Sequence, residues 1–536
     1  MRPLPVLVVP LVALAIAPMS ADRTPPTVSG FHVHATGKPF AGDRPLLATI
    51  SPNGDGFRDR AAISFRLSEP ARVYLTISKT LRRPTLVYVR ARDFTRGRHT
   101  VYWAPQNVPP RTYLVRLSAV DRAGNRTTLG VASAGQLRRT GARSPVIRVL
   151  GVDAAFQRPS YAEGQNAGLV VESDAKELTV QLFRSGSERA AADARNQMYG
   201  VAAGEPLVLP WTSWRHRPHR VRLRIPPLPS GFYYAQLTAD DGRLGYAPFI
   251  VRPPRLGTAR AAVVLPTTTW QAYNFRDEDG DGWGDTWYAG ISTTPVRLGR
   301  PFLDRGVPPK FRAYDVSFLR WLHETRRDVD YLAEPDLERA GGAALAAAYD
   351  LIVFPGHTEY VTRREYDVVE RYRDLGGNLA FLSANNFFWQ VSRRGRTLRK
   401  ATKWREVDRP EAALIGVQYL ANDEGIIKAP YVVVSATTAP WFWEGTDLAD
   451  GSEFGDVHGG FGIEIDARSR QSPRGTMVLA QVPNLFGPGY TAEMTYYETP
   501  AGAKVFAAGT VDFGGRARYR PVKRMLSNLW DRLSQP

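Results

Sequence analysis

Polar and apolar residues alternate through the first half of the chain. Clusters of Gly, Pro, Asn and Asp separate the alternating runs. Period-two alternation bounded by turn residues is typical of strands in a small β-sandwich. The clearest runs are residues 63–67, 73–77 and 113–119, followed by 178–182, 221–225 and 230–237. We therefore predict two β-sandwich modules, at residues 24–143 and 145–253, joined to the rest of the chain at Pro253-Pro254.

The pattern changes after about residue 257. Continuous apolar runs appear at residues 261–265, 351–354 and 379–382, as in strands that are buried on both faces of a parallel sheet. Helical patterns alternate with these runs. One helix is expected to begin near Arg363, because Thr362 and Glu365 form a capping-box pattern. Residues 257–536 are thus predicted to form an α/β doubly wound domain, of the kind found in glutamine amidotransferases.

The N-terminus has the pattern of an export signal. Arg2 precedes an almost unbroken apolar run from Val6 to Ala17, and small residues follow. This run is shorter than the roughly 20 residues that a membrane span needs. We expect residues 1–21 to be a signal peptide and the protein to be secreted or held in the cell envelope, with an uncleaved N-terminal anchor as the alternative.

The chain is strongly basic, with a net charge of +18 and a pI near 10. Arginines occur along its whole length, acidic residues are interspersed, and no long basic run is present. A nucleic-acid-binding protein would concentrate its basic residues on one face or arm. We therefore expect no nucleic-acid partner; weak attraction to anionic cell-surface polymers, and so association with the cell envelope, is the alternative to a merely basic exported protein.

Several kinds of chemistry are excluded by the residues that are missing. The chain contains no cysteine, so disulfides, thiolate zinc sites and the cysteine-dependent amidotransferase mechanism are all ruled out. The sequence has no G-x-S-x-G elbow of a serine hydrolase. It also has no G-x-G-x-x-G turn or Walker loop, which argues against a nucleotide cofactor.

Polar side chains follow three of the predicted parallel strands. The segment 267–274 with Tyr273 follows the first, His357 and Glu359 follow the second, and Asn385 follows the third. If the strands are neighbours, these turns converge on the ligand-binding edge of the sheet. The set is rich in phenol and carboxylate oxygens, which are hard donors and suit a ferric ion better than zinc.

Several motifs together resemble the large (beta) subunit of N,N-dimethylformamidase. They are residues 269–274, 318–322, 356–360, 385–391 and 496–500, and the similarity covers about residues 225 to 530. The resemblance implies a mononuclear iron held by two tyrosines and one glutamate. The implied metal ligands are Tyr233, Tyr273 and Glu359, with Tyr234 as the neighbouring alternative to Tyr233, and the other implied site residues are His357, Asn385 and Glu498. Residues 51–56 and 113–125 in turn resemble bacterial immunoglobulin-like modules.

The resemblance implies an exported amide hydrolase that acts on a small or peptide-like amide. The alternative is a non-catalytic secreted or surface protein whose α/β domain binds carbohydrate or a protein partner. Whether the chain forms a homo-oligomer or has a small partner subunit stays open.

An acidic loop follows closely on Tyr273. Asp277, Asp279 and Asp281 have the spacing of the first ligands in an EF-hand calcium loop. The twelfth position is Tyr288 in place of the usual bidentate glutamate. A calcium site and a solvated turn therefore both remain open for this loop.

Overall fold

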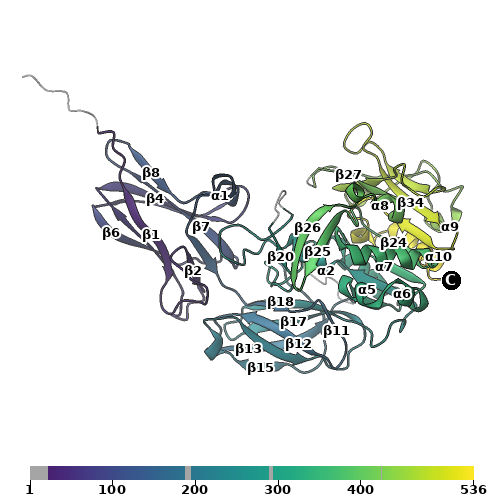
Figure 1. Ribbon diagram of the computed structural model, residues 1–536, viewed down its shortest axis with the longest axis horizontal. Coiled ribbons are helices and arrows are strands. Elements are labelled where there is room, and N and C mark those ends of the chain that lie inside the picture. Colours follow the sequence, from purple (N-terminus) through teal and green to yellow (C-terminus); the bar gives the residue numbers. More distant parts are fainter. Residues whose placement is uncertain (1–21, 187–194, 289–293, 424, 536) are drawn as a thin grey trace, which may run out of the picture.

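The computed structural model describes residues 22–186, 195–288, 294–423 and 425–535. The predicted signal peptide, residues 1–21, lies outside these described residues. The molecule is a multi-domain, β-rich protein in which two sandwiches precede a larger C-terminal part (Figure 1). Within the described ranges, no helix is long and apolar enough to cross a membrane.

The first sandwich is built from two sheets that pack face to face. One sheet has the order β1 (Val28–Ala35), β3 (Ala61–Leu67) and β6 (Gly97–Trp103). The other has the order β2 (Leu47–Ile50), β9 (Val146–Val149), β7 (Arg111–Val120), β4 (Ala71–Lys79) and β5 (Leu86–Phe94), with β8 (Arg126–Leu129) also paired to β7. The inward residues of the alternating runs, such as Phe65 and Leu75, form its core. Strand β9 belongs to this sandwich, so the module extends past the boundary predicted at residue 143; helix α1 (Ala134–Thr140) precedes that strand.

The second sandwich repeats this arrangement. Its sheets have the orders β10-β12-β16 and β11-β18-β17-β13-β14, with β15 paired to β13. The strands are β10 (Asp153–Phe156), β11 (Ser160–Tyr161), β12 (Asn166–Glu172), β13 (Glu177–Arg184), β14 (Val201–Ala202), β15 (Leu207–Pro210), β16 (His219–Arg224), β17 (Gly231–Ala239) and β18 (Leu244–Val251).

Each sandwich contains a tyrosine whose hydroxyl fixes a chain bend. Tyr113 Oη donates to the carbonyl of Pro109 at 2.7 Å, and Tyr233 Oη donates to the carbonyl of Pro229 at 3.0 Å. In both cases the acceptor lies four residues before the tyrosine, near the start of a central strand. This is the tyrosine corner of immunoglobulin-like sandwiches, and it gives both residues a structural role.

The C-terminal part is organised around a nine-stranded mixed sheet. Five neighbouring strands are parallel: β21 (Asp330–Ala333), β19 (Ala261–Leu265), β22 (Leu351–Phe354), β24 (Asn378–Phe381) and β35 (Lys504–Ala507). Four antiparallel strands continue the sheet: β34 (Ala492–Glu498), β33 (Met477–Val482), β29 (Tyr431–Val433) and β30 (Glu453–Phe454).

Helices cover both faces of the parallel strands, because alternate strand residues point to opposite sides. On one face Ala262 and Val264 pack with α5 (Glu334–Ala340), α6 (Gly342–Ala348) and α7 (Arg363–Asp374). On the other, Val263 and Leu265 pack with α4 (Val316–Glu324) and α10 (Val522–Leu533). Helix α7 begins where the sequence predicts, with the Thr362 side chain accepting from the Glu365 amide. The remaining helices are α2 (Thr267–Tyr273), α3 (Phe311–Tyr314), α8 (Glu411–Ile415) and α9 (Pro440–Trp443).

Short strands of the C-terminal part form three smaller sheets that are separate from the main sheet. They form a four-stranded sheet in the order β20 (Val296–Arg297), β26 (Thr397–Lys403), β25 (Trp389–Arg394) and β23 (Tyr360–Thr362), and two pairs, β27 (Gln418–Asn422) with β32 (Glu464–Ala467) and β28 (Lys428–Ala429) with β31 (Phe461–Gly462).

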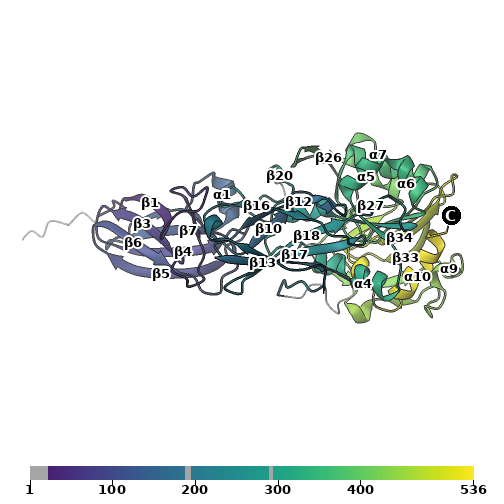
Figure 2. The ribbon, with the colours of Figure 1, turned by 90° about the horizontal axis from the view of Figure 1, so that it is seen from below.

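The loop after Tyr273 is where the three parts of the molecule meet, and Figure 2 shows them in a row. Arg276 pairs with Asp153 at 2.8 Å and with Glu172 at 2.7 Å, both on the second sandwich. The carbonyl of Gly280 accepts from Arg44 of the first sandwich at 3.3 Å. A Cβ on Gly280 would overlap Leu47, so glycine is needed for this close approach.

Candidate metal centre

The carboxyl ends of three neighbouring parallel strands bring their polar side chains together. Tyr273, at the end of the helix that follows β19, donates its phenol to Glu359 Oε2 at 2.5 Å and lies 2.9 Å from His357 Nε2. His357 and Glu359 follow β22, which pairs with both β19 and β24. All three side chains are buried. The convergence of these turns, which the sequence predicts from strand order, is therefore found in the structure.

Backbone contacts hold the His357–Glu359 turn in place. The Glu359 amide donates to Thr269 Oγ1 on α2 at 3.0 Å, and the Thr358 amide donates to Asn386 Oδ1 at 3.0 Å. The preceding residue, Gly356, lies against Asp315, and a Cβ at this position would overlap Asp315 Oδ1. The turn is thus fixed by groups from all three strand ends, and its side chains are held in one arrangement.

His357 has one ring nitrogen anchored and the other directed at acidic groups. Nδ1 contacts the carbonyl of Ala384 at 2.9 Å, so this nitrogen carries a proton and donates. Nε2 lies 3.2 Å from Glu359 Oε2 and 3.6 Å from Glu464 Oε2. Burial alone would lower the pKa of His357, but Glu464 and Glu359 together outweigh it and raise the pKa to about 9.

Glu464 is a site residue that the sequence reasoning missed. It accepts a hydrogen bond from Asn385 Nδ2 at 2.9 Å, and Asp466, two residues on in β32, accepts from the Asn385 amide at 2.8 Å. Burial raises the pKa of Glu464, and it raises the pKa of Asp466 to about 8. The only sequence signal was a pair of acids alternating with isoleucine in an otherwise apolar stretch, Gly462-Ile463-Glu464-Ile465-Asp466.

A second buried phenol lies at the same carboxylate. Tyr360 is 2% exposed, and its ring centroid lies 6.1 Å from that of Tyr273 in an edge-on arrangement. Burial, followed by the charge of Glu359 and a hydrogen bond to it, raises the pKa of the Tyr360 phenol well above its ordinary value. Burial and Glu359 raise the pKa of Tyr273 in the same way. Two phenols and one carboxylate therefore share a dry site at the sheet edge.

Two residues implied by the resemblance lie elsewhere. Tyr233 packs in the core of the second sandwich and uses its hydroxyl in the tyrosine corner described above. The neighbouring Tyr234 stacks on Phe183 at 5.4 Å, on the opposite side of the same strand. Glu498 is exposed and pairs with Arg532 at 2.9 Å. The structure thus brings together Tyr273, His357, Glu359 and Asn385, and places Tyr233 and Glu498 outside this group.

The acidic loop has the carboxylates of a cation site. Oxygens of Asp277, Asp279 and Asp281 lie within 4.8 Å of one another. Backbone amides of the loop also donate to them, as in an ordinary Asx turn: the amides of Asp281 and Gly282 both donate to Asp277. Burial, and then the charge of Asp281, raises the pKa of Asp277 to about 7. Calcium binding at this loop stays a prediction, because both interpretations account for this arrangement.

Two comparisons with known proteins point to the same family. A family model described as "N,N-dimethylformamidase beta subunit-like, C-terminal" matches residues 179–523. The N,N-dimethylformamidase beta subunit of Paracoccus aminophilus is 23% identical over 400 residues, which cover 56% of this chain and 52% of that subunit. The chain therefore matches about half the length of this relative.

Similarity to solved structures is much weaker. The native conformation of Escherichia coli alpha-2-macroglobulin is 12% identical over 45% of this chain and 18% of that chain, with a TM-score of 0.21. The trypsin-activated form is 13% identical over 45% of this chain and 19% of that chain, with a TM-score of 0.22. TM-scores this low carry no argument about fold or function.

Proposed function

Because the chain belongs to the N,N-dimethylformamidase beta subunit-like family, we propose that it is an amide hydrolase whose site is the cluster around Glu359. The observation that carries this proposal is the 2.5 Å contact between Tyr273 and Glu359, with His357 within 3.2 Å of the same carboxylate oxygen. Residues from separate strands meet there in a buried group of hard oxygen donors. Such a group has no evident purpose as packing.

The donors in this cluster fit a mononuclear ferric ion. Tyr273, Tyr360 and Glu359 would hold it, with Tyr360 in the place that the sequence resemblance gave to Tyr233. Both phenol pKa values are raised in the ion-free cluster, so a highly charged cation is needed to favour phenolate. The bound ion supplies Lewis acidity toward an amide carbonyl and toward water.

His357 is the proposed proton carrier. Its Nδ1 is anchored on Ala384, which leaves Nε2 as the nitrogen that faces the reacting groups. Glu359 and Glu464 stabilise the protonated ring. Because the pKa of His357 is raised to about 9, the ring is protonated near neutral pH and suits delivery of a proton to the leaving amine nitrogen.

Asn385 is the proposed positioning group for the substrate. Its Nδ2 is committed to Glu464, whereas its buried Oδ1 has no hydrogen-bond partner among the described residues. A free amide oxygen beside the cluster can accept from the N–H of a secondary amide substrate. An unpaired buried acceptor costs about 1–3 kcal/mol, so a substrate donor would recover part of that cost.

Further parts of the proposal concern the setting of the site. We infer that the C-terminal domain is of the amidotransferase-like α/β type, supported by five parallel strands with the site at their carboxyl ends. We also infer export to the cell envelope or beyond, on the N-terminal apolar run. The substrate is proposed to be a small or peptide-like amide, and assembly as a homo-oligomer is consistent with the proposal.

Metal analysis and absorption spectroscopy test this proposal together. Protein supplied with iron should contain about one ion per chain and should be coloured, because tyrosinate bound to ferric iron absorbs visible light. Glu359→Gln and Tyr273→Phe should each lose the ion and the colour, while Glu498→Gln should keep both. A panel of formamides, acetamides and short peptides is then assayed for release of amine. Colourless, iron-free wild-type protein with no amidase activity would leave the alternative, a non-catalytic surface protein that binds carbohydrate or a partner.

A further inference from the structure

The positive charge of the chain is concentrated in the first sandwich. Residues 22–150 contain 22 Lys and Arg but only seven Asp and Glu, a net charge of +15. Residues 151–536 contain 47 Lys and Arg and 45 Asp and Glu, a net charge of +2. Basic residues are spread along the chain, as the sequence suggested, but the acidic residues that would balance them are not. Acidic residues are therefore interspersed mainly in the later part of the chain and are scarce in this module.

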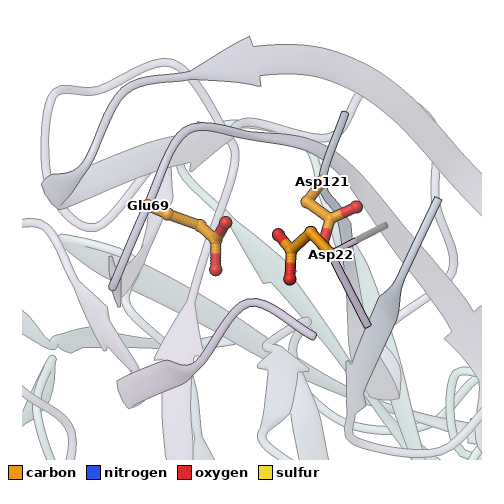
Figure 3. Close-up of side chains that lie close together, drawn as sticks. All are labelled: Asp22, Glu69 and Asp121. Atoms are coloured by element: carbon orange, nitrogen blue, oxygen red, sulfur yellow. The ribbon is translucent and has the colours of Figure 1, made fainter. Parts of the chain in front are cut away.

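The few acidic residues of the first sandwich are gathered in two places. Asp22, Glu69 and Asp121 form one cluster, with carboxylate oxygens within 4.8 Å of one another (Figure 3). Three others lie between residues 43 and 59, where they accept hydrogen bonds from local groups or pair with Arg215 of the second sandwich: Asp43, Asp55 and Asp59. Asp93 is the seventh, and it lies 3.8 Å from Arg72. Most of the module's surface thus has no balancing negative charge.

Unpaired arginines line one edge of this sandwich. Strands β5 and β6 are edge strands of different sheets and are joined by residues 95–96. Five exposed residues on these two strands, their connection and the neighbouring strand β3 form what we call the arginine edge: Arg66, Arg90, Arg92, Arg96 and Arg98. None of the five has an ion-pair partner within the part of the chain that the structure describes. Strand β6 lies on the side of the module away from the C-terminal domain (Figure 1).

The arginine edge includes a repulsive pair. Arg66 and Arg98 lie directly opposite each other in the β3–β6 ladder. Like charges directly opposite each other destabilise a sheet. A bound anion would therefore offset the repulsion between Arg66 and Arg98.

We propose that the arginine edge binds a linear anionic polymer that carries phosphodiester or carboxylate groups. The guanidinium fork pairs with two oxygens of either group. Alternate residues on a strand repeat at roughly 7 Å, so Arg90 and Arg92 present charges at a spacing that a flexible chain of repeated anions can follow. The predicted export of the protein favours an envelope polymer over nucleic acid. This proposal does not depend on the proposed amide hydrolysis.

The test compares two full-length variants with the same net charge. One changes the five residues of the arginine edge to glutamine. The matched control changes five exposed arginines of the C-terminal domain that make no ion pair in the described structure: Arg363, Arg394, Arg399, Arg470 and Arg474. The probes are polygalacturonate for the carboxylate source and a glycerol-phosphate polymer for the phosphodiester source, with neutral dextran and single-stranded DNA for comparison.

Wild type and control should bind one or both anionic polymers, and which polymer binds identifies the source. Removing the arginine edge should weaken binding by about 10- to 100-fold at about 50 mM salt, since each exposed ion pair contributes up to about 1 kcal/mol. It should also make the dependence of affinity on salt concentration shallower. The melting temperature should stay the same or rise, which shows that the variant folds.

Three results would overturn the proposal. An equal loss in both variants would mean that net charge alone drives binding. Tighter binding of the edge to single-stranded DNA than to both polymers would assign it to nucleic acid. If wild type binds neither polymer at about 50 mM salt, the arginine edge does not bind linear polymers that carry phosphodiester or carboxylate groups.

Discussion

Replacement of Tyr233 by phenylalanine distinguishes a structural tyrosine from a metal ligand. The change removes one hydroxyl and leaves the ring in its core position. In the structure this hydroxyl has one role, the 3.0 Å hydrogen bond to the carbonyl of Pro229. A net loss of about 1 kcal/mol is expected for one such bond. In a sandwich of this size that corresponds to a melting temperature lower by about 4 °C.

The first sandwich provides a matched control for this change. Tyr113→Phe removes the equivalent hydrogen bond to Pro109, at 2.7 Å, in a module that contains none of the proposed iron ligands. Both variants should lose stability to a similar degree in thermal unfolding followed by circular dichroism. Both should keep the iron content and visible absorption of the wild type. Tyr360→Phe should differ from both in losing iron and colour.

The assignment of the second phenol depends on this comparison. If Tyr233→Phe loses iron while Tyr113→Phe keeps it, Tyr233 is a ligand, and the placement of Tyr360 in the metal centre is refuted. If all three variants keep iron, the two-tyrosine centre itself is wrong. Iron content should be measured by elemental analysis on protein purified under identical conditions, because loss of a weakly held ion during purification would otherwise imitate loss of a ligand.

Three other predictions follow from contacts near the site and from the acidic loop. Gly356→Ala places a Cβ against Asp315. It should lower the free energy of unfolding by about 1–3 kcal/mol and should lower activity, as measured by denaturant unfolding and by amine release. Wild-type stability and activity in this variant would show that the turn is not rigid. Burial raises the pKa of Glu334 to about 7, so the stability that its protonated form provides below about pH 4.5 is lost as the pH rises through 7. The free energy of unfolding, measured with denaturant, should fall by about 3 kcal/mol between pH 4.5 and 7 in wild type, and Glu334→Gln should remove this fall. If the variant shows the same dependence of stability on pH as wild type, the raised pKa of Glu334 is contradicted. Calcium should raise the melting temperature of wild type but not of Asp277→Asn, and a titration without heat would leave the loop as a turn.

The sequence predicted the parallel strands and the proximity of Tyr273 to Glu359, for a physical reason. Strands that are buried on both faces appear in the sequence as short apolar runs. When such strands are parallel, their carboxyl ends lie at the same edge of the sheet. Tyr273 and Glu359 could therefore be placed near each other without knowledge of the fold. The two tyrosine corners could not be told from the sequence, because a tyrosine near the start of a strand has the same pattern in either role.

The rest of the site was beyond the sequence. Glu464 lies on β32, which pairs with β27 and forms an isolated bridge to Thr510, a residue far along the chain. Strands of two to five residues that pair across long loops leave no periodic pattern, so their register could not be derived. The asymmetry of charge between the modules was countable from the sequence. The whole-chain net charge and the even spread of arginines do not display it, because it consists in the scarcity of acidic residues between positions 22 and 150.

The segment that begins at Arg276 connects both N-terminal sandwiches to the cluster around Glu359. It starts three residues after Tyr273, is clamped by two carboxylates of the second sandwich, and ends against Leu47 of the first. Removal of the first sandwich would expose the face of this segment that packs against Leu47. We therefore expect that removal of the first sandwich loosens the segment that follows Tyr273, and with it the position of Tyr273 beside Glu359.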